Sequence, residues 1–209
     1  MKFWILTIFL LLLSFVASAQ AQTIYGTNDV QRFREGRDKE FRNPGYTPLI
    51  GEDFTNFKGL KYFDVDNKFA VQAKFEKTED RQIFTMPTSV GTSRKYFKFG
   101  VLKFELDGKS HALTVFQSET TASQAEYKDL LFVPFRDLTN GQETYGAGRY
   151  LDIKMPSGSE VILDFNLAYN PNCAYGNESF SCAIPPRENF LQTEIKAGEK
   201  IFPSAAKKQ

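Results

Sequence analysis

The sequence is poor in the side chains that carry out most enzymatic chemistry. Among 209 residues it has one histidine, His111, and two cysteines, Cys173 and Cys182. It has no Gly-x-Ser-x-Gly elbow, so any Ser-His-Asp arrangement must use His111. It has no Walker-type loop, and Gly146-Ala147-Gly148 leads into a predicted strand instead of the helix N-terminus that binds phosphate. The common nucleophile and nucleotide-binding templates are therefore missing.

An excess of one charge is missing as well. The chain has 26 basic and 25 acidic residues, and removal of residues 1–19 would take away Lys2 and balance the two. This balance disfavours a nucleic acid or an anionic membrane as partner. Internal repeats, low-complexity tracts and interdomain linkers are also lacking, while aromatic residues make up 15% of the chain and supply a core. The length suits a single domain.

The long apolar run of the sequence lies at its start. Lys2 precedes an apolar stretch from Phe3 to Val16, which ends in Ala17-Ser18-Ala19. This order is typical of a signal peptide at residues 1–19, with cleavage after Ala19 or, as a second site, after Ala21. The alternative is an uncleaved membrane anchor, but the run is short for a span. We expect an exported protein, periplasmic or extracellular, with no stable membrane span after cleavage.

Hydrophobic periodicity predicts one helix followed by strands. Asn28 can cap a helix that ends before Asn43-Pro44-Gly45 and has Arg37 on the same side as its apolar residues. Strands are expected at residues 68–76, 83–86, 101–106, 109–116, 130–135, 145–153 and 161–167, with a final edge strand at 195–202. This order predicts a mainly β fold, a single antiparallel β domain over residues 28–202. The domain would be a barrel or flattened sandwich with one N-terminal helix, followed by a flexible tail at residues 203–209.

The clearest hairpin turns at Asp107-Gly108, a dipeptide suited to a type I′ turn. With that turn Phe104 opposes His111, which places the single histidine on the apolar face. As a functional residue His111 would be a general base near neutral pH. The structural alternative is a hydrogen-bonded residue in the core or at its rim.

Two further positions carry polar groups where a strand should bury apolar ones. Arg149 shares the apolar side of its predicted strand, and if buried it needs a carboxylate or several carbonyls. Its candidate partners are Asp137, Glu143 and Asp164. Asp164 and Asn166 lie side by side on one face of the last predicted strand, which favours a polar pocket there. In the strand at 130–135, Pro134 removes one ladder donor and predicts an edge, a bulge or a break in pairing.

The stretch from Asp164 to Glu199 holds both cysteines and is dense in Asn, Tyr and Pro. It resembles the signature of the DUF1684 family of bacterial proteins. The residues that carry this resemblance are Asp164-Phe165-Asn166, Ala168-Tyr169-Asn170-Pro171, Cys173-Ala174-Tyr175, Cys182, Pro185-Pro186, Glu188-Asn189 and Ala197-Gly198-Glu199-Lys200. The likeness extends over roughly residues 30 to 202. The family is one of unknown function, so the resemblance implies domain boundaries and a shared polar constellation but no reaction.

Cys173 and Cys182 both lie in the part of the chain that we expect to be exported. An oxidising compartment favours a disulfide between them, worth about 2 to 3 kcal/mol for so short a loop. Free or redox-active thiols and a metal site are the alternatives. Two thiols and one distant histidine are too few ligands for a structural zinc site.

The shared constellation supplies the candidate site residues. Those for ligand binding are Arg136, Asp137, Tyr145, Arg149, Asp164, Asn166, Tyr169, Asn170, Tyr175, Glu188 and Asn189, and those for catalysis are Asp164, Glu188 and His111. The carboxylates could form an acid and base pair, or pair with arginines as scaffold, and the asparagines could satisfy loop backbone groups. No cofactor or metal is predicted.

Three functions are compatible with these residues. The preferred one is a binding domain with a polar pocket that takes a small polar or anionic molecule through Arg149 or Arg136. The alternatives are a carboxylate-based, hydrolase-like enzyme and a structural or interaction protein of the cell envelope. A titrating, partly buried carboxylate pair in one cleft would favour the enzyme, and an arginine fully enclosed by carboxylates with no cavity beside it would favour the structural protein. The sequence predicts no oligomeric state.

Overall fold

The computed structural model describes residues 27–79 and 81–203. The helices are α1 (Thr27–Phe41), α2 (Gly51–Thr55) and the 3-10 turns η1 (Asn67–Phe69), η2 (Phe165–Leu167), η3 (Asn172–Tyr175) and η4 (Arg187–Asn189). The strands are β1 (Ala70–Lys77), β2 (Ile83–Pro87), β3 (Ser93–Leu106), β4 (Lys109–Ser118), β5 (Leu130–Phe135), β6 (Arg149–Lys154) and β7 (Glu160–Asp164). The predicted signal peptide and residues 204–209 of the predicted tail lie outside the described residues. Within the described ranges, no helix is long and apolar enough to cross a membrane.

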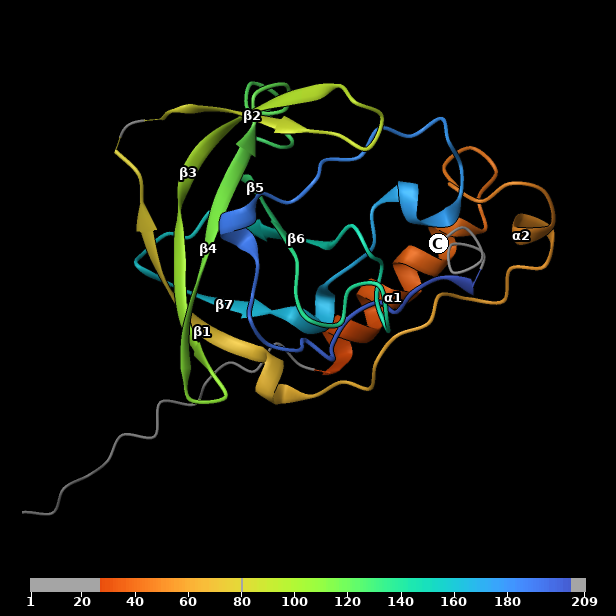
Figure 1. Ribbon diagram of the computed structural model, residues 1–209, viewed down its shortest axis with the longest axis horizontal. Helices are drawn as coiled ribbons and strands as arrows, with labels where there is room; N and C mark the ends of the chain where they lie inside the picture. Colours follow the sequence, from red (N-terminus) through yellow and green to blue (C-terminus); the bar gives the residue numbers. More distant parts are fainter. Residues whose placement is uncertain (1–26, 80, 204–209) are drawn as a thin grey trace, which may run out of the picture.

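The strands form one curled antiparallel sheet, a half-barrel (Figure 1). Its order is β6-β5-β4-β3-β1-β7, and β2 pairs with the first part of β3. The long strand β3 therefore has two partners on one side, β2 at its start and β1 at its end. Leu102, Leu113 and Val133 are fully buried on the inner side of the curl. The prediction of a single antiparallel β domain with one main helix is confirmed.

The hairpin between β3 and β4 has the predicted turn and register. Asp107 and Gly108 have φ angles of 50° and 71°, the two positive values that a type I′ turn requires. Phe104 is paired with His111, and their rings stack with centroids 5.6 Å apart.

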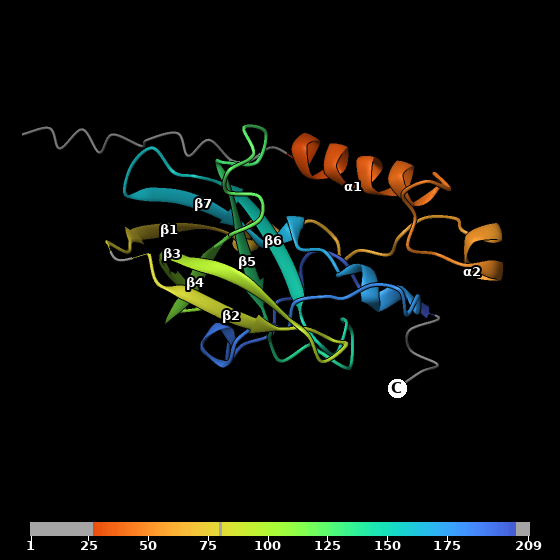
Figure 2. The same ribbon diagram turned by 90° about the horizontal axis from the view of Figure 1, so that it is seen from above.

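The helix α1 ends at Phe41, before the predicted turn, and packs beside the sheet with the C-terminal segments (Figure 2). Its apolar side buries Val30 and Phe41. Phe41 belongs to a second core with Leu49, Leu60 and Tyr175, separate from the core inside the sheet. The molecule thus has a sheet half and a helix half, and the candidate site lies where the two halves meet.

One side chain completes the sheet at the predicted break in pairing. Strands β4 and β5 share a single paired position, Phe116 with Phe132. Beyond it the Asn189 amide donates to the carbonyls of Thr114 and Pro134, at 2.8 and 2.7 Å, and accepts the Thr114 N–H at 2.8 Å. Asn189 therefore stands in for ladder bonds that Pro134, which lacks an N–H, cannot make.

Four predicted strands differ from the structure. The strand expected at 101–106 begins at Ser93, and its added first part pairs with β2. The strand expected at 145–153 begins at Arg149, because Gly148 has a φ of 108° and approaches Phe135 so closely that a Cβ there would lie 2.6 Å from its carbonyl oxygen. The strand expected at 161–167 ends at Asp164, whose side chain accepts the Asn166 N–H at 2.9 Å and caps η2.

The expected strand at 195–202 is absent from this described segment, which is irregular. The carbonyls of Ile195, Ala197 and Glu199 accept hydrogen bonds from the Arg149 guanidinium instead of from a neighbouring strand.

Candidate functional site

Arg149 is fully buried and its side chain is enclosed by the protein. Its Nη2 contacts the Asp137 carboxylate at 2.6 Å and donates to the Ile195 carbonyl at 2.8 Å. Its Nη1 donates to the carbonyls of Ala197 and Glu199. Burial lowers the pKa of the guanidinium, and the neighbouring Asp137 opposes this shift. Of the three candidate partners, Asp137 is the one that pairs with Arg149.

A second buried group is centred on Glu199, which has no exposed surface. Its carboxylate accepts hydrogen bonds from the Tyr175 hydroxyl and from the backbone and side-chain nitrogens of Asn170, the latter two at 3.1 and 3.0 Å. Arg37 of α1 lies 3.6 Å from its Oε2. Burial raises the pKa of the Glu199 carboxyl, and Arg37 and the hydrogen bonds from Tyr175 and Asn170 only partly offset this.

The remaining sequence-predicted residues are spread over several places. Asp164 and Asn166 bond to one another, and Asn166 is tied to the backbone of Asp66. Glu188 is exposed and pairs with Lys98 at 3.2 Å. Tyr145 packs against the helix-side core, and Arg136 is exposed.

His111 borders a surface hollow of about 850 Å³ over β1, β3 and β4. Its Nε2 is buried without a hydrogen-bond partner among the described residues. Both basic and acidic side chains line this hollow, namely Lys74, Lys103, Glu105 and Glu160. Neither Glu188 nor Asp164 lines this hollow, so the three catalytic candidates do not share it.

A smaller polar pocket of about 440 Å³ lies between α1, the outer face of the sheet and the loop closed by the cysteines. Arg37, Arg94, Tyr96, Tyr150 and Tyr169 line it. Residues 171–172 and 180–183 form the remaining wall together with Phe132. Of the sequence-predicted ligand-binding residues, Tyr169 is the one that lines this pocket.

Two guanidinium groups face the pocket. The Arg37 side chain is 14% exposed and lies over the rings of Phe41 and Tyr169, each with its centroid 5.0 Å from Cζ. Its Nε is buried and has no hydrogen-bond partner in the described part of the chain. Arg94 is exposed and donates to the Ser181 carbonyl through one nitrogen, at 2.9 Å. Other guanidinium nitrogens of Arg94 are therefore free to contact a ligand.

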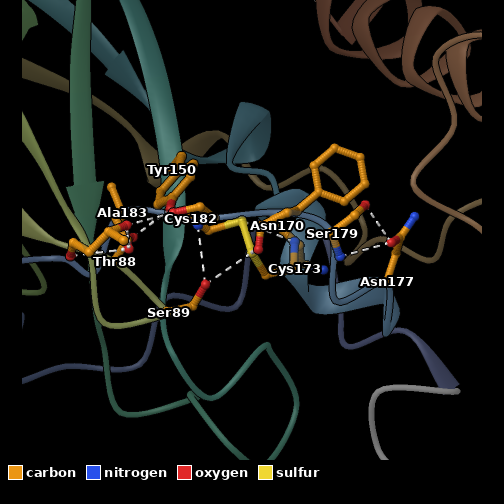
Figure 3. The surroundings of a disulfide bond; sticks show 12 residues. Thr88, Ser89, Tyr150, Asn170, Cys173, Asn177, Ser179, Cys182 and Ala183 are labelled. Atoms are coloured by element: carbon orange, nitrogen blue, oxygen red, sulfur yellow. Dashed lines mark hydrogen bonds between the residues drawn. A yellow bond between two sulfur atoms is a disulfide. The ribbon is translucent and has the colours of Figure 1, made fainter.

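The disulfide between Cys173 and Cys182 fixes the loop wall of the pocket (Figure 3). The Ser89 hydroxyl accepts the Cys182 N–H at 3.2 Å, and the Ser89 N–H donates to the Cys182 carbonyl at 2.9 Å. The Tyr150 hydroxyl donates to the Ala183 carbonyl, which ties the loop to β6 as well. The loop is thereby held against the β2–β3 turn and the sheet.

Sequence reasoning missed Arg37, Arg94 and Glu199 as site residues. Arg37 had a signal, because it falls on the apolar side of α1, where a charged residue needs a partner. Glu199 had a weaker one, as a carboxylate within the motif-rich stretch. Arg94 had none, since it follows an ordinary turn between β2 and β3. Among the described residues there is no cluster of three or more His, Cys, Asp or Glu side chains suited to a metal ion.

Comparisons with known proteins agree with the resemblance seen in the sequence. The family described as "Protein of unknown function (DUF1684)" matches residues 55–200. A solution NMR structure of an uncharacterized protein of Haloarcula marismortui is 38% identical, with a TM-score of 0.66, and covers 83% of this chain and 92% of that chain. No curated protein matches the chain. These descriptions name no activity.

Proposed function

The chain belongs to the DUF1684 family, and we propose that it binds a small anionic or polar molecule in the pocket beside the disulfide loop. The observation that carries this proposal is the pair of guanidinium groups, Arg37 and Arg94, at one polar hollow. A volume of about 440 Å³ falls in the range of small-molecule sites. The proposal keeps the ligand class expected from the sequence but moves its recognition from Arg149 and Arg136 to Arg94 and Arg37.

The lining suits a carboxylate or phosphate group. Arg94 has donors in a planar fork that matches either anion, and Arg37 of α1 adds a second positive charge. The rings of Tyr96 and Tyr150 supply apolar surface with polar tips, which is common in ligand grooves. The disulfide-pinned loop supports a preformed wall, so little ordering is needed when a ligand binds.

The alternatives have less support. An enzyme of the carboxylate type needs two acids in one cleft, whereas Asp164 is engaged with Asn166 and Glu188 with Lys98. A structural role fits the enclosed Arg149 but leaves the arginine-lined pocket without a purpose. Arg149 is better assigned to the scaffold behind the site.

Ligand binding can be tested by thermal shift with acetate, succinate, benzoate and inorganic phosphate as probes. We expect the unfolding midpoint of the wild-type protein to rise with the concentration of at least one probe. The rise should be lost in Arg94→Gln and kept in Arg136→Gln, which removes an exposed arginine outside the pocket. Equal shifts in Arg94→Gln and wild type would contradict the proposal.

We also propose that the protein acts outside the cytoplasm. The Cys173–Cys182 disulfide supports this, because such bonds persist in oxidising compartments. The test is to express the full sequence in a Gram-negative host and to determine the N-terminus of the product. A periplasmic product beginning at Gln20 or Gln22 is expected, and a cytoplasmic product that retains residues 1–19 would refute export.

A further inference from the structure

Resting on the proposed function, we infer that the ligand is a zwitterion whose anionic group contacts Arg94 and Arg37 and whose cationic group contacts Asp152. Asp152 does not line the pocket itself, but it is hydrogen-bonded to the lining residue Tyr169 and so adds an acidic group at the pocket's edge. The ligand class is a small molecule that carries opposite charges at its two ends, such as an aminocarboxylate.

Asp152 stands on the same face of β6 as Tyr150, two residues before it, and therefore points to the side of the sheet that bears the pocket. It is paired across the sheet with Phe132, which lines the pocket. Its Oδ2 accepts a hydrogen bond from the Tyr169 hydroxyl at 2.6 Å, and the Tyr169 ring carries Arg37 above it. The Tyr169 side chain thus contacts both Arg37, through its ring, and Asp152, through its hydroxyl.

The Asp152 carboxylate has no cationic partner of its own. In residues 27–79 and 81–203, no lysine or arginine nitrogen lies within 4.0 Å of it, although the residue is exposed. Burial of the carboxyl group by surrounding protein atoms raises its pKa, and the Tyr169 hydrogen bond and the charge of Arg37 only partly oppose the shift. A ligand cation beside Asp152 would supply the missing positive charge.

Aromatic rings line the path between the two ends. Phe132 lies with its ring centroid 5.5 Å from that of Tyr96 and 4.7 Å from that of Tyr150. The Tyr150 and Tyr169 rings meet edge to face at 5.8 Å. Ring faces attract an ammonium group, and they also cover the methylene groups that separate the charges of a zwitterion.

The charges of the site oppose ligands of a single sign. A simple anion at Arg37 would be repelled by Glu199, whose carboxylate lies 3.6 Å from that guanidinium. A simple cation at Asp152 would be repelled by Arg37, whose charge acts on the Asp152 carboxyl. A zwitterion in one orientation places each of its charges next to the opposite charge of the protein.

The test compares matched compounds on the full protein by thermal shift and calorimetry. The probes are β-alanine, 4-aminobutyrate and 6-aminohexanoate, each with the carboxylate that lacks its amine and the amine that lacks its carboxylate. We expect one aminocarboxylate to bind about five- to tenfold more tightly than its matched carboxylate. Asp152→Asn should abolish this preference while leaving binding of the simple carboxylate intact. Tyr169→Phe, which keeps the ring, is the control for loss of the hydrogen bond alone.

The outcomes separate the inference from the proposal on which it rests. Equal affinity for aminocarboxylates and carboxylates, with both lost in Arg94→Gln, would overturn the zwitterion and keep the anion site. A preference that persists unchanged in Asp152→Asn would overturn the role of Asp152. If no probe responds to Arg94→Gln, both the site and the inference fail.

Discussion

Single buried charges hold the two halves of this molecule together. Arg149 and Glu199 are both without exposed surface, and the Arg149 guanidinium donates to the Glu199 backbone carbonyl. Glu199 in turn faces Arg37, which lines the pocket. The buried residues therefore position the exposed site through an unbroken series of contacts.

Removal of the Arg149 charge should be costly. In Arg149→Met the Asp137 carboxylate stays buried without its partner, and we expect a loss of about 3 to 5 kcal/mol in the free energy of unfolding. Arg136→Met is the matched control at an exposed position and should change it by less than about 0.5 kcal/mol. Urea denaturation measures both. Equal stability of Arg149→Met and wild type would show that the ion pair contributes nothing net.

The raised pKa of Glu199 predicts a dependence of stability on pH. Because the carboxyl binds its proton more tightly in the folded state, the folded protein holds more protons from the ordinary pKa of 4.5 upward. The contribution of the Glu199 carboxyl to the free energy of unfolding therefore falls as pH rises from 4.5 to the pKa of this carboxyl in the folded state. Glu199→Gln removes the titration.

We expect the stability of wild type relative to Glu199→Gln to decline as pH rises above the ordinary carboxyl pKa of 4.5, as measured by urea denaturation. Glu188→Gln, at an exposed position, is the control and should give a profile close to that of wild type. Parallel profiles for wild type and Glu199→Gln would mean that the folded pKa is not raised.

At the scale of elements, the sheet depends on a side chain from outside it. Asn189 of η4 joins β4 to β5 where backbone pairing stops. The connection is possible because a carboxamide has both donors and an acceptor, as a peptide group does.

Asn189→Ala should leave the Thr114 N–H and two carbonyls unsatisfied in a buried place. We expect a loss of about 2 to 4 kcal/mol. Asn189→Asp keeps the acceptor but removes both donors and adds a buried charge, so it should be at least as destabilising. Thermal unfolding compares these with Asn67→Ala, an exposed control. A tolerated Asn189→Asp would show that the two donated bonds are dispensable.

The disulfide loop is the element that shapes the pocket wall. The Cys173→Ser, Cys182→Ser double variant should lose about 2 to 3 kcal/mol, the closure entropy of a short loop. Arg94 donates a hydrogen bond to the Ser181 carbonyl within this loop. The double variant should therefore also bind an anionic probe more weakly than wild type does. Calorimetry at a temperature where the variant is folded measures the affinity, and an unchanged value would mean that Ser89 and Tyr150 alone hold the loop.

At the scale of the whole molecule, the segment at 195–202 belongs to both halves. Ile195 and Ala197 are buried in the sheet core, while Glu199 bonds to Tyr175 of the helix-side core. Neither core is complete without this segment.

A chain that ends at Glu194 should therefore fail to fold. It would lack three carbonyls that receive the Arg149 hydrogen bonds and the carboxylate that faces Arg37. We expect the loss of the cooperative unfolding transition in circular dichroism, with the full chain as control. A cooperative transition in the shortened chain would show that the sheet half folds alone.

Local pattern determined much of the fold. Alternation of apolar residues placed most strands, the Asp107-Gly108 dipeptide set the β3–β4 register, and the ordered motifs after Asp164 indicated the family. The pairing of Arg149 with a nearby acid also followed from the sequence, because a buried charge needs a partner. These features depend on neighbours along the chain or on the general cost of burial.

Tertiary structure alone decided where the pocket lies. Arg37 meets the Asn170 carbonyl 133 residues away, and the Arg149 guanidinium takes up carbonyls that would otherwise have served a strand at 195–202. Hydrophobic periodicity in the sequence indicates which side of a helix or strand is buried, but not which distant segment packs against that side. The sequence therefore determined the sheet, its helix and its disulfide loop, and only their packing brought Arg37 and Arg94 to one pocket.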